Sequence, residues 1–543
     1  MALQVRWLGR AKYKDAYALQ KALFGTSTSD YLLLCEHNHV FTLGVRADKA
    51  HILVEPAAVD AEVFDVDRGG DVTYHGPGQL VGYPIINVDF GSDMTPRYVH
   101  SLEEAIIRTL FDYGIEAAVL EGYPGVWVGA NSDNPRKIAA IGVKITRGRT
   151  MHGFALNVST NMDYFSYIVP CGLTGMAVTS MAQEGVDVPL AEVGEKFLGH
   201  FARIFGFDDV NYAGVDRSAP WAIRVEKDDN EHRAVASRLN QRLKRAGVDP
   251  ASGLVISERK PSWLRLRAEM GPEYRQLKSF LRKMSLTTVC EEAGCPNIYE
   301  CWQQGTATFM INGDKCTRSC GFCLVDTSKP LELDPEEPGR VATAVSDMGL
   351  SFAVVTAVAR DDLADGGAGA FRATIDAIHD LDSGCGVEVL IPDCKGDGGS
   401  LATIFDARPE VLNHNIETPL RLQRAVRPQA SYARSLSVLA RAKEAGLVVK
   451  SGIMVGIGET IDEVKTSLFD LRSVGVDIVT IGQYLRPTED HLPIARYYTP
   501  EEFDELRAYG YALGFAHVEA SPMARSSYHA KTGASAVRSQ VLV

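Results

Sequence analysis

The hydrophobic and polar positions show a different periodicity in each half of the chain, and the change occurs near the middle. Before residue 220, runs with strand-like alternation are mixed with a few stretches of helical periodicity. The predicted strands and hairpins are 31–43, 63–88, 119–128 and 138–158, and the predicted helices are 12–23, 96–113 and 190–205. Strands grouped in this way indicate an α+β domain.

The second half alternates apolar runs with helical segments. Its six predicted strands are 307–312, 352–358, 387–392, 411–417, 448–456 and 477–485. Six strand–helix units imply parallel strands with right-handed crossovers, and so an α/β partial or full barrel. The carboxyl ends of these strands carry polar residues, namely Cys316, Asp361, Asp393, Glu417, Glu459 and Gln483. Active sites of such barrels lie at the carboxyl ends of the strands, where these residues are expected.

Between the two halves lies a charged, weakly periodic stretch that includes EKDDNEHR and NQRLKR. We predict a linker over 221–259, with domains at 1–220 and 260–543. The alternative is a long insertion inside a single domain, but the change in hydrophobic periodicity after this stretch favours a domain boundary.

Composition and charge exclude several classes of protein. The 543 residues are 45% hydrophobic and 23% charged, which is typical of globular proteins, and the net charge of -13 disfavours binding to nucleic acid. No run of about 18 apolar residues is present, and the first residues lack the layout of an export or transit peptide. We therefore expect a soluble, cytoplasmic protein that binds neither nucleic acid nor membrane.

Six of the ten cysteines lie between Cys290 and Cys323. Cys316, Cys320 and Cys323 form a C-x3-C-x2-C loop directly after the first barrel strand. Three thiolates can hold three irons of a four-iron cubane and leave the fourth iron open for another ligand. The alternative is a structural zinc site, although such sites usually have four protein ligands.

A second cysteine triplet precedes this loop. Cys290, Cys295 and Cys301 have C-x4-C-x5-C spacing. They could hold a second cluster or be small buried side chains.

From about residue 260 the chain resembles lipoyl synthase, a member of the radical S-adenosylmethionine superfamily. The matching motifs include CEEAGCPNIYECW, CTRSCGFC, ARDDLADGG, NIETP, SGIMVGIGE and RSSYHA. The resemblance implies a partial (β/α)6 barrel and insertion of two sulfurs at C6 and C8 of a protein-bound octanoyl chain.

The resemblance also implies two [4Fe-4S] clusters and S-adenosyl-L-methionine. One cluster would be held by Cys316, Cys320 and Cys323, and its free iron would bind S-adenosylmethionine. The auxiliary cluster, the sulfur donor, would be held by the earlier triplet and a serine of RSSYHA; of Ser526 and Ser527 we expect Ser527. We expect Asn415 and Glu417 to contact the nucleotide. Gly366 and Gly367 are weaker candidates, because Gly-Gly more often marks a turn.

The N-terminal half offers one thiol of interest, Cys171 in PCGLTG, and one basic residue, Lys137, before an apolar run. A nucleophilic cysteine needs a nearby base or cation. Taken alone, a cysteine beside glycine is usually a packing residue, and a lysine that opens a strand is usually solvated.

The surrounding motifs, RGGDVTYHGPGQLVGYP, RKIAAIGVKITRG, MHGFALNVSTNMDYF and PCGLTGMAVTSM, resemble the lipoyl (octanoyl) transferase family, whose fold is shared with biotin and lipoate ligases. The resemblance makes Cys171 the acceptor of the octanoyl group and Lys137 the base that activates it. The acyl pocket would be lined by three segments: Arg68, Gly69, Gly70, Asp71, Val72, Thr73, Tyr74 and His75; Ala140, Ile141 and Gly142; Gly153, Phe154 and Ala155. His75 and His152 are either catalytic bases or hydrogen-bonded anchors of their loops.

We therefore expect a bifunctional lipoylation enzyme. The expected partners are octanoyl-acyl carrier protein, lipoyl domains of 2-oxoacid dehydrogenases, the glycine cleavage H protein, and an electron donor such as ferredoxin or flavodoxin. Three alternatives stay open: an ATP-dependent lipoate ligase or a non-catalytic docking module in the N-terminal half, and an electron-transfer role for the C-terminal half.

Overall fold

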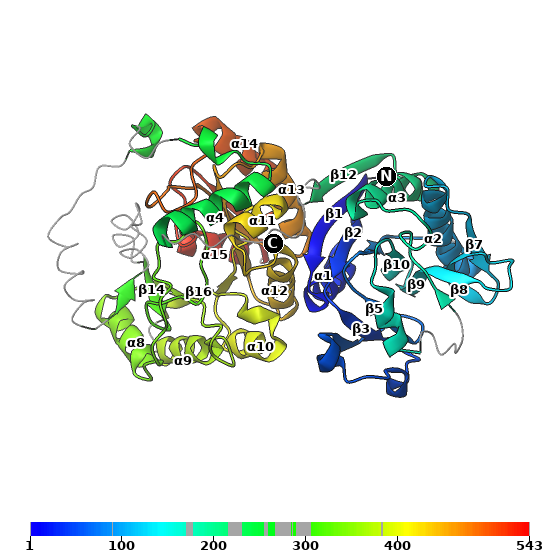
Figure 1. The fold of residues 1–543 in the computed structure, drawn as a ribbon. Coiled ribbons are helices and arrows are strands. Elements are labelled where there is room, and N and C mark those ends of the chain that lie inside the picture. The colour runs from blue at the N-terminus through cyan, green and yellow to red at the C-terminus, as the bar shows by residue number, and fades with distance from the viewer. Residues whose placement is uncertain are drawn as a thin grey trace. The chain divides into compact units, whose positions relative to one another are not determined.

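The computed structural model describes residues 2–89, 91–169, 177–214, 231–254, 259–265, 284, 286–288, 306–381 and 384–541. The chain divides into two compact units, Met1–Arg217 and Ser218–Val543 (Figure 1). In the described part of the chain, no helix is long and apolar enough to cross a bilayer.

The first unit is built on a nine-stranded mixed sheet. Its strands are β1 (Ala2–Ala11), β2 (Asp30–His37), β6 (Gln79–Ile85), β7 (Ala117–Leu120), β8 (Tyr123–Val128), β9 (Arg136–Thr146), β10 (Arg149–Asn157), β11 (Ala177–Val178) and β12 (Asp209–Gly214). The order is β12-β1-β2-β6-β10-β9-β8-β7, with β11 beside β9. A separate sheet has the order β4-β3-β5, from β3 (Val40–Leu43), β4 (Glu62–Asp65) and β5 (Val72–His75).

Helices cover both faces of the large sheet. Helices α2 (Met94–Phe111) and α3 (Leu190–Phe205) share one core with Leu32 and Leu34 of β2. The alternate residues Leu33 and Cys35 are also fully buried, and α1 (Tyr13–Thr26) packs on β6 and β10. A strand buried on both faces is apolar throughout, as 31–35 is. The predicted α+β fold is confirmed, although β1 and β12 were not predicted.

The second unit is built on an eight-stranded sheet. Its strands, in spatial order, are β13 (Thr287–Thr288), β14 (Thr306–Ile311), β15 (Phe352–Ala357), β16 (Gly386–Leu390), β17 (Val411–Asn413), β18 (Val449–Val455), β19 (Ile478–Gln483) and β20 (His517–Ala520). All pairs from β14 to β20 are parallel, while β13 is antiparallel to β14. The predicted barrel type is confirmed: all six predicted strands are present, and β20 adds a seventh parallel strand.

Within the described residues, the α-helices of this unit are α4 (Glu231–Arg245), α8 (Glu337–Asp347), α9 (Ala368–His379), α10 (Gly398–Asp406), α11 (Gln423–Val426), α12 (Tyr432–Glu444), α13 (Ile461–Ser473), α14 (Pro500–Ala512) and α15 (Ala530–Val541). The crossover helices α8, α9 and α10 lie side by side (Figure 1).

Helix α4 lies inside the segment predicted as a linker. Its Leu239 and Leu243, and Val248 beyond it, belong to one apolar cluster with Ile457 and Leu492 of the barrel. This part of 221–259 therefore packs on the barrel. The domain boundaries at 220 and 260 remain a prediction.

Candidate functional sites

In the first unit, the glycine-rich loop that begins at Arg68 lies against strand β9. The Gly69 amide donates to the Val143 carbonyl at 3.1 Å. A Cβ on Gly142 would be 3.1 Å from both the Gly69 oxygen and the Arg68 Cδ, so a glycine permits this close approach. The Arg68 guanidinium is buried and donates to the Thr42 carbonyl at 2.7 Å, which fixes the loop.

The other two predicted pocket segments, 140–142 and 153–155, lie side by side on strands β9 and β10. In the β9–β10 pair, Ala140 lies opposite Ala155, Ile141 opposite Phe154, and Gly142 opposite Gly153. The remaining residues form the end of the loop and strand β5, namely Asp71, Val72, Thr73, Tyr74 and His75. The structure therefore brings the loop onto β9 and pairs β9 with β10.

Asp67, which precedes the loop, is the centre of a hydrogen-bonded cluster. It accepts from Lys144 at 2.6 Å and from Tyr17 at 3.0 Å, and it lies 2.8 Å from the Nε2 of His152. Burial alone would raise the pKa of Asp67, but these hydrogen bonds outweigh it and hold the pKa below its usual value. Asp67, Tyr17 and Lys144 were not predicted from the sequence; the position of Asp67 directly before R-G-G was the available signal.

The two candidate histidines of this unit are hydrogen-bonded inside the protein. The Nδ1 of His75 lies 2.9 Å from the side-chain oxygen of Gln79, and burial lowers its pKa to about 3. His152 adopts a positive φ of 61°, is held by Asp67, and has a pKa lowered mainly by burial. Both contacts fit the alternative in which these histidines anchor their loops.

Lys137 lies on β9, with its Nζ 4.7 Å from the centroid of the Trp127 ring. Strand β11 pairs with β9 so that Val178 lies opposite Lys137, and the Thr179 amide donates to the Lys137 carbonyl at 2.9 Å. Cys171, the predicted nucleophile, lies outside the described residues. Ala177, six positions after it in the sequence, is paired with Arg136.

In the second unit, the C-x3-C-x2-C loop follows strand β14 and carries three free thiols, those of Cys316, Cys320 and Cys323. The loop is held at both sides, because the Gly321 amide donates to Val426 at 2.9 Å and its carbonyl accepts from Leu492 at 3.0 Å. Burial raises the pKa of Cys320, and raises that of Cys323 to about 12.

The donor set fits an iron–sulfur cube. Three cysteines on one loop are the ligands that such a cluster uses when one iron stays open. Among the described residues, no three His, Cys, Asp or Glu side chains converge as a single metal ion would require. A cube does not require this convergence, because each thiolate binds a different iron.

Arg318, inside the loop, joins it to the ends of two barrel strands. Its guanidinium donates to Asp361 at 2.7 and 2.9 Å and to Asp393 at 2.6 Å. Arg434 also donates to Asp393, which is fully buried. Burial alone would raise the pKa of Asp393, but Arg318 and Arg434 hold it well below the usual value. Two of the predicted strand-end carboxylates therefore fix the cysteine loop.

The candidate nucleotide residues lie beyond strand β17. The Asn415 side-chain amide donates to Glu417 at 3.0 Å and to the Ser526 hydroxyl at 2.7 Å, while its buried Oδ1 has no hydrogen-bond partner. Glu417 has a positive φ of 63°, and burial raises its pKa although Arg427 opposes this shift. Asn415 therefore offers an unpartnered buried oxygen beside a residue with a left-handed backbone, a combination that often marks a binding site for a polar ligand.

The two remaining strand-end residues hold loops. Glu459 accepts from the amides of Ile457 and Gly458 at 3.0 and 3.1 Å. The Gln483 side chain accepts from the Tyr498 amide at 2.8 Å.

The ligands expected for an auxiliary cluster are described only in part. Cys290, Cys295 and Cys301 lie outside the described residues. The Ser527 carbonyl accepts from the amide of Ala530 at 3.3 Å, at the start of α15. The hydroxyl of the neighbouring Ser526 is already bonded to Asn415.

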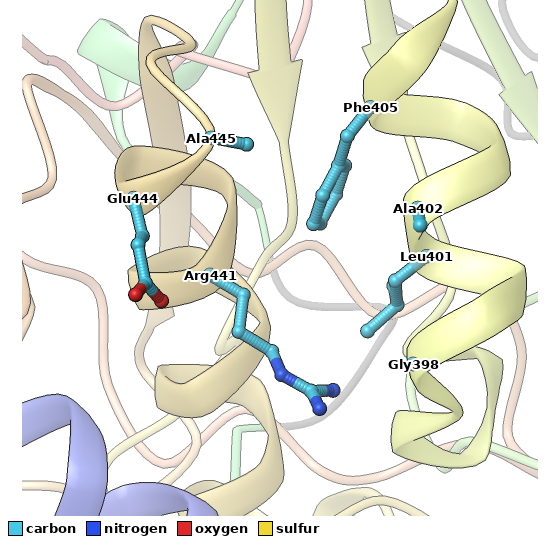
Figure 2. A pocket seen from close by; sticks show the side chains of 7 residues that line it. All are labelled: Gly398, Leu401, Ala402, Phe405, Arg441, Glu444 and Ala445. Carbon is cyan, nitrogen blue, oxygen red and sulfur yellow. The ribbon is translucent and has the colours of Figure 1, made fainter.

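A pocket of about 280 Å³ lies elsewhere, between the crossover helices α10 and α12. Figure 2 shows Arg441 pointing across it toward Leu401 and Gly398, with Phe405 from the facing helix. Arg441 donates to the Gly396 carbonyl at 3.2 Å. No predicted site residue lines this pocket.

Family models match both halves of the chain. Residues 12–202 match the lipoyl protein ligase A/B catalytic domain, residues 226–295 the N-terminal domain of lipoyl synthase, and residues 310–471 the radical SAM superfamily.

Curated relatives match the C-terminal half. The lipoyl synthase of Rubrobacter xylanophilus is 60% identical over 273 residues, which are 50% of this chain and 85% of that protein. The lipoyl synthase of Mycobacterium avium is 57% identical, over 50% of this chain and 89% of that protein.

Solved structures are similar to each half. A bipartite lipoate protein ligase from Thermoplasma acidophilum has a TM-score of 0.34 and 18% identity, covering 39% of this chain and 86% of that one. Methylornithine synthase has a TM-score of 0.31 and 15% identity, covering 52% of this chain and 85% of that one.

Proposed function

The chain belongs to the lipoyl synthase family through its C-terminal half, and from this premise we propose that it catalyses two consecutive steps of protein lipoylation. The N-terminal half, a lipoyl protein ligase A/B catalytic domain, transfers octanoyl from octanoyl-acyl carrier protein to a lysine of a lipoyl domain. The C-terminal half then inserts sulfur at C6 and C8 of that chain. The observation that carries the proposal is that one polypeptide contains both catalytic domains.

In the proposed transfer, the Cys171 sulfur attacks the octanoyl carbonyl while Lys137 accepts the thiol proton. The bond to the carrier's sulfur breaks, this sulfur takes the proton from Lys137 so that the carrier leaves as a thiol, and a thioester remains on the enzyme. The amine of the target lysine then attacks this thioester, forms an amide and releases the Cys171 thiol. Because the thioester conserves acyl reactivity, no ATP is needed.

The described residues around β9 support this chemistry. The strand carries both Lys137 and Gly142, and the loop of Arg68 to Gly70 lies directly on Gly142. Backbone amides near a pocket can stabilise the negative charge that develops on a thioester oxygen. Strand β11, which begins six positions after Cys171 in the sequence, pairs beside Lys137.

In the C-terminal half, Cys316, Cys320 and Cys323 would hold a [4Fe-4S] cluster with one open iron, and Asn415 and Glu417 would contact S-adenosylmethionine. These groups, when bound, supply the radical that removes hydrogen from C–H bonds that no side chain can deprotonate. Arg318 ties the cysteine loop to Asp393, and a hydrogen bond joins Asn415 to Glu417, the two residues proposed to contact the nucleotide. A second [4Fe-4S] cluster, on Cys290, Cys295, Cys301 and Ser527, would donate the sulfur.

The transfer step is tested by intact-mass measurement. After incubation with octanoyl-acyl carrier protein and no ATP, the chain should gain the mass of one octanoyl group, and Cys171→Ala should gain none. The buried Cys35→Ala variant is the control and should still be acylated. Modification that requires free acid and ATP would instead identify a lipoate ligase, and the absence of any acylation would favour a docking module.

The sulfur-insertion step is tested after anaerobic reconstitution with iron and sulfide. We expect about eight irons per chain, four for each cluster. The reconstituted chain should convert an octanoylated lipoyl domain to the lipoyl form with cleavage of S-adenosylmethionine. Iron uptake without this cleavage would support an electron-transfer role instead.

Joining the two halves would raise the local concentration of the octanoylated intermediate. The comparison is with the separated halves mixed at equal concentration. If they work as fast as the intact chain, the intermediate is not handed over.

A further inference from the structure

Helix α4 is amphipathic along its described side chains, 238–245. Leu239 and Leu243 are buried at four-residue spacing and face the barrel. Arg238, Arg242 and Arg245 recur at positions that share one flank of a helix. Arg238 is exposed, and Arg242 and Arg245 are half-buried. The helix therefore presents a row of guanidinium groups beside its apolar stripe.

This helix lies directly behind the cysteine loop. A Cβ on Gly321, between Cys320 and Cys323, would be 2.9 Å from the Leu239 side chain, so Leu239 packs on the loop backbone. Phe322 of the loop packs on the same apolar cluster as Leu239 and Leu243.

The charges on this flank are not neutralised within the described structure. Among the described ion pairs, none joins a carboxylate to Arg238, Arg242 or Arg245. The residues 238–245 contain four cationic and no acidic side chains, in a chain whose net charge is -13. Maintaining like charges side by side costs free energy, which an acidic partner would offset.

We propose that the Arg238, Arg242 and Arg245 flank of helix α4 is the docking surface for an acidic one-electron carrier protein. A low-potential carrier of the ferredoxin or flavodoxin class bound there gives up one electron and is oxidised. The electron is received by the iron that Cys316, Cys320 and Cys323 would hold. This inference rests on the radical chemistry proposed for the C-terminal half, which requires such a reductant.

The geometry favours an electron carrier over the octanoylated substrate domain. In the proposed reaction the octanoyl chain reaches the strand ends near Asp393, toward which Arg318 projects from the loop, and near Asn415. Helix α4 contacts a different part of the same loop, the backbone of Gly321. Charge complementarity mainly accelerates association, which is the property that a transient electron carrier needs.

The test uses the reconstituted full-length chain and the double variant Arg238→Glu with Arg245→Glu. Sulfur insertion is measured with a reduced, acidic flavodoxin and, separately, with dithionite. At low salt we expect the flavodoxin-driven rate to fall about 10-fold or more, since steering of this kind changes association rates by 10- to 1,000-fold. The dithionite-driven rate should be unchanged. The control is Arg372→Glu with Lys465→Glu, which reverses two cations on α9 and α13.

An unchanged flavodoxin-driven rate in the variant overturns the proposal. An equal loss with both reductants also overturns it, because the flank would then serve folding or bind the octanoylated domain. Binding of oxidised flavodoxin to the chain without S-adenosylmethionine is measured in parallel and should weaken in the variant. If the wild-type chain binds flavodoxin but dithionite drives no turnover, the proposed function fails while the docking surface remains.

Discussion

The guanidinium of Arg318 donates a hydrogen bond of 2.6 Å to the buried carboxylate of Asp393, which lies just beyond strand β16. Arg318 stands between Cys316 and Cys320, so this contact ties the cysteine loop to the barrel. The loop position therefore depends on a charge that Asp393 supplies.

Replacing Asp393 by Asn preserves the shape of the side chain but removes the negative charge that pairs with Arg318 and Arg434. Breaking a buried ion pair by removing one partner costs about 3–5 kcal/mol. We expect a loss of this size in denaturant-induced unfolding of the C-terminal unit and a several-fold fall in iron bound per chain. Asp376→Asn, at an exposed pair on α9, is the control and should change neither. Full iron uptake by the Asp393 variant would contradict the role of this contact.

Replacing Gly44 by Ala should disturb the glycine-rich loop. A Cβ at Gly44 would overlap the Gly70 carbonyl oxygen and lie 2.8 Å from an Arg68 guanidinium nitrogen. Overpacking of this kind costs about 1–3 kcal/mol and shifts the backbone. We expect slower acyl-enzyme formation in mass measurements. Gly25→Ala, with no atom within 4 Å of the new Cβ, should form the acyl-enzyme at the normal rate.

Lys137 is predicted to be the base in acyl transfer. Lys137→Ala should slow acylation of Cys171 by about 100- to 10,000-fold, the usual contribution of a positioned acid or base. The exposed Lys14→Ala on α1 should have no effect. A recovery of the variant at higher pH, where the thiol ionises unaided, would be consistent with loss of a base. Full activity of the variant at neutral pH would exclude Lys137 from this role.

Buried neutral histidines should make the N-terminal unit sensitive to acid. Burial lowers the pKa of His37 to about 4 and that of His75 to about 3, below the unfolded value of about 6.5. The unfolded chain therefore binds more protons, so stability falls as the pH drops from about 6.5 toward 4. Each histidine contributes at most about 1.4 kcal/mol per pH unit. In thermal unfolding, His75→Gln should give a shallower decline, and an unchanged slope would contradict this account.

The place of helix α4 can be tested by truncation. A fragment beginning at 218 retains Leu239 and Leu243, whereas one beginning at 260 loses both and exposes their partners Ile457 and Leu492. Loss of even one such leucine side chain costs about 2–5 kcal/mol. We expect the shorter fragment to be less stable and to lose iron. Equal stability of the two fragments would support a linker that ends at 259.

Both fold classes and all six barrel strands were predicted from the sequence, because apolar runs of this length report burial directly. Strand β1 was missed because its alternation, with Arg6 buried among apolar neighbours, differs from a simple pattern. The Arg6 guanidinium donates hydrogen bonds to the side-chain oxygens of Gln4 and Asn211, and Asn211 lies on β12, 205 positions away in the sequence.

Candidate site residues could be named from the sequence where motifs carry them, whereas the long-range contacts that hold them could not. The cysteine loop follows from spacing alone. The contacts of Asp67 with Lys144 and His152 join residues more than 70 positions apart, and neither periodicity nor spacing predicts them. The contact between Arg318 and Asp393 could not be predicted for the same reason, because 75 positions separate the two residues.

Gly321 is enclosed between Leu239 of α4 and Leu492, at 2.9 and 2.8 Å from the position of a Cβ. Helix α4 and the cysteine loop can pack this closely because residue 321 has no side chain. An engineer who grafts this barrel onto another scaffold would have to transfer α4 with it. One who imports a cysteine loop with a larger residue at this position would have to trim Leu239 or Leu492 in compensation.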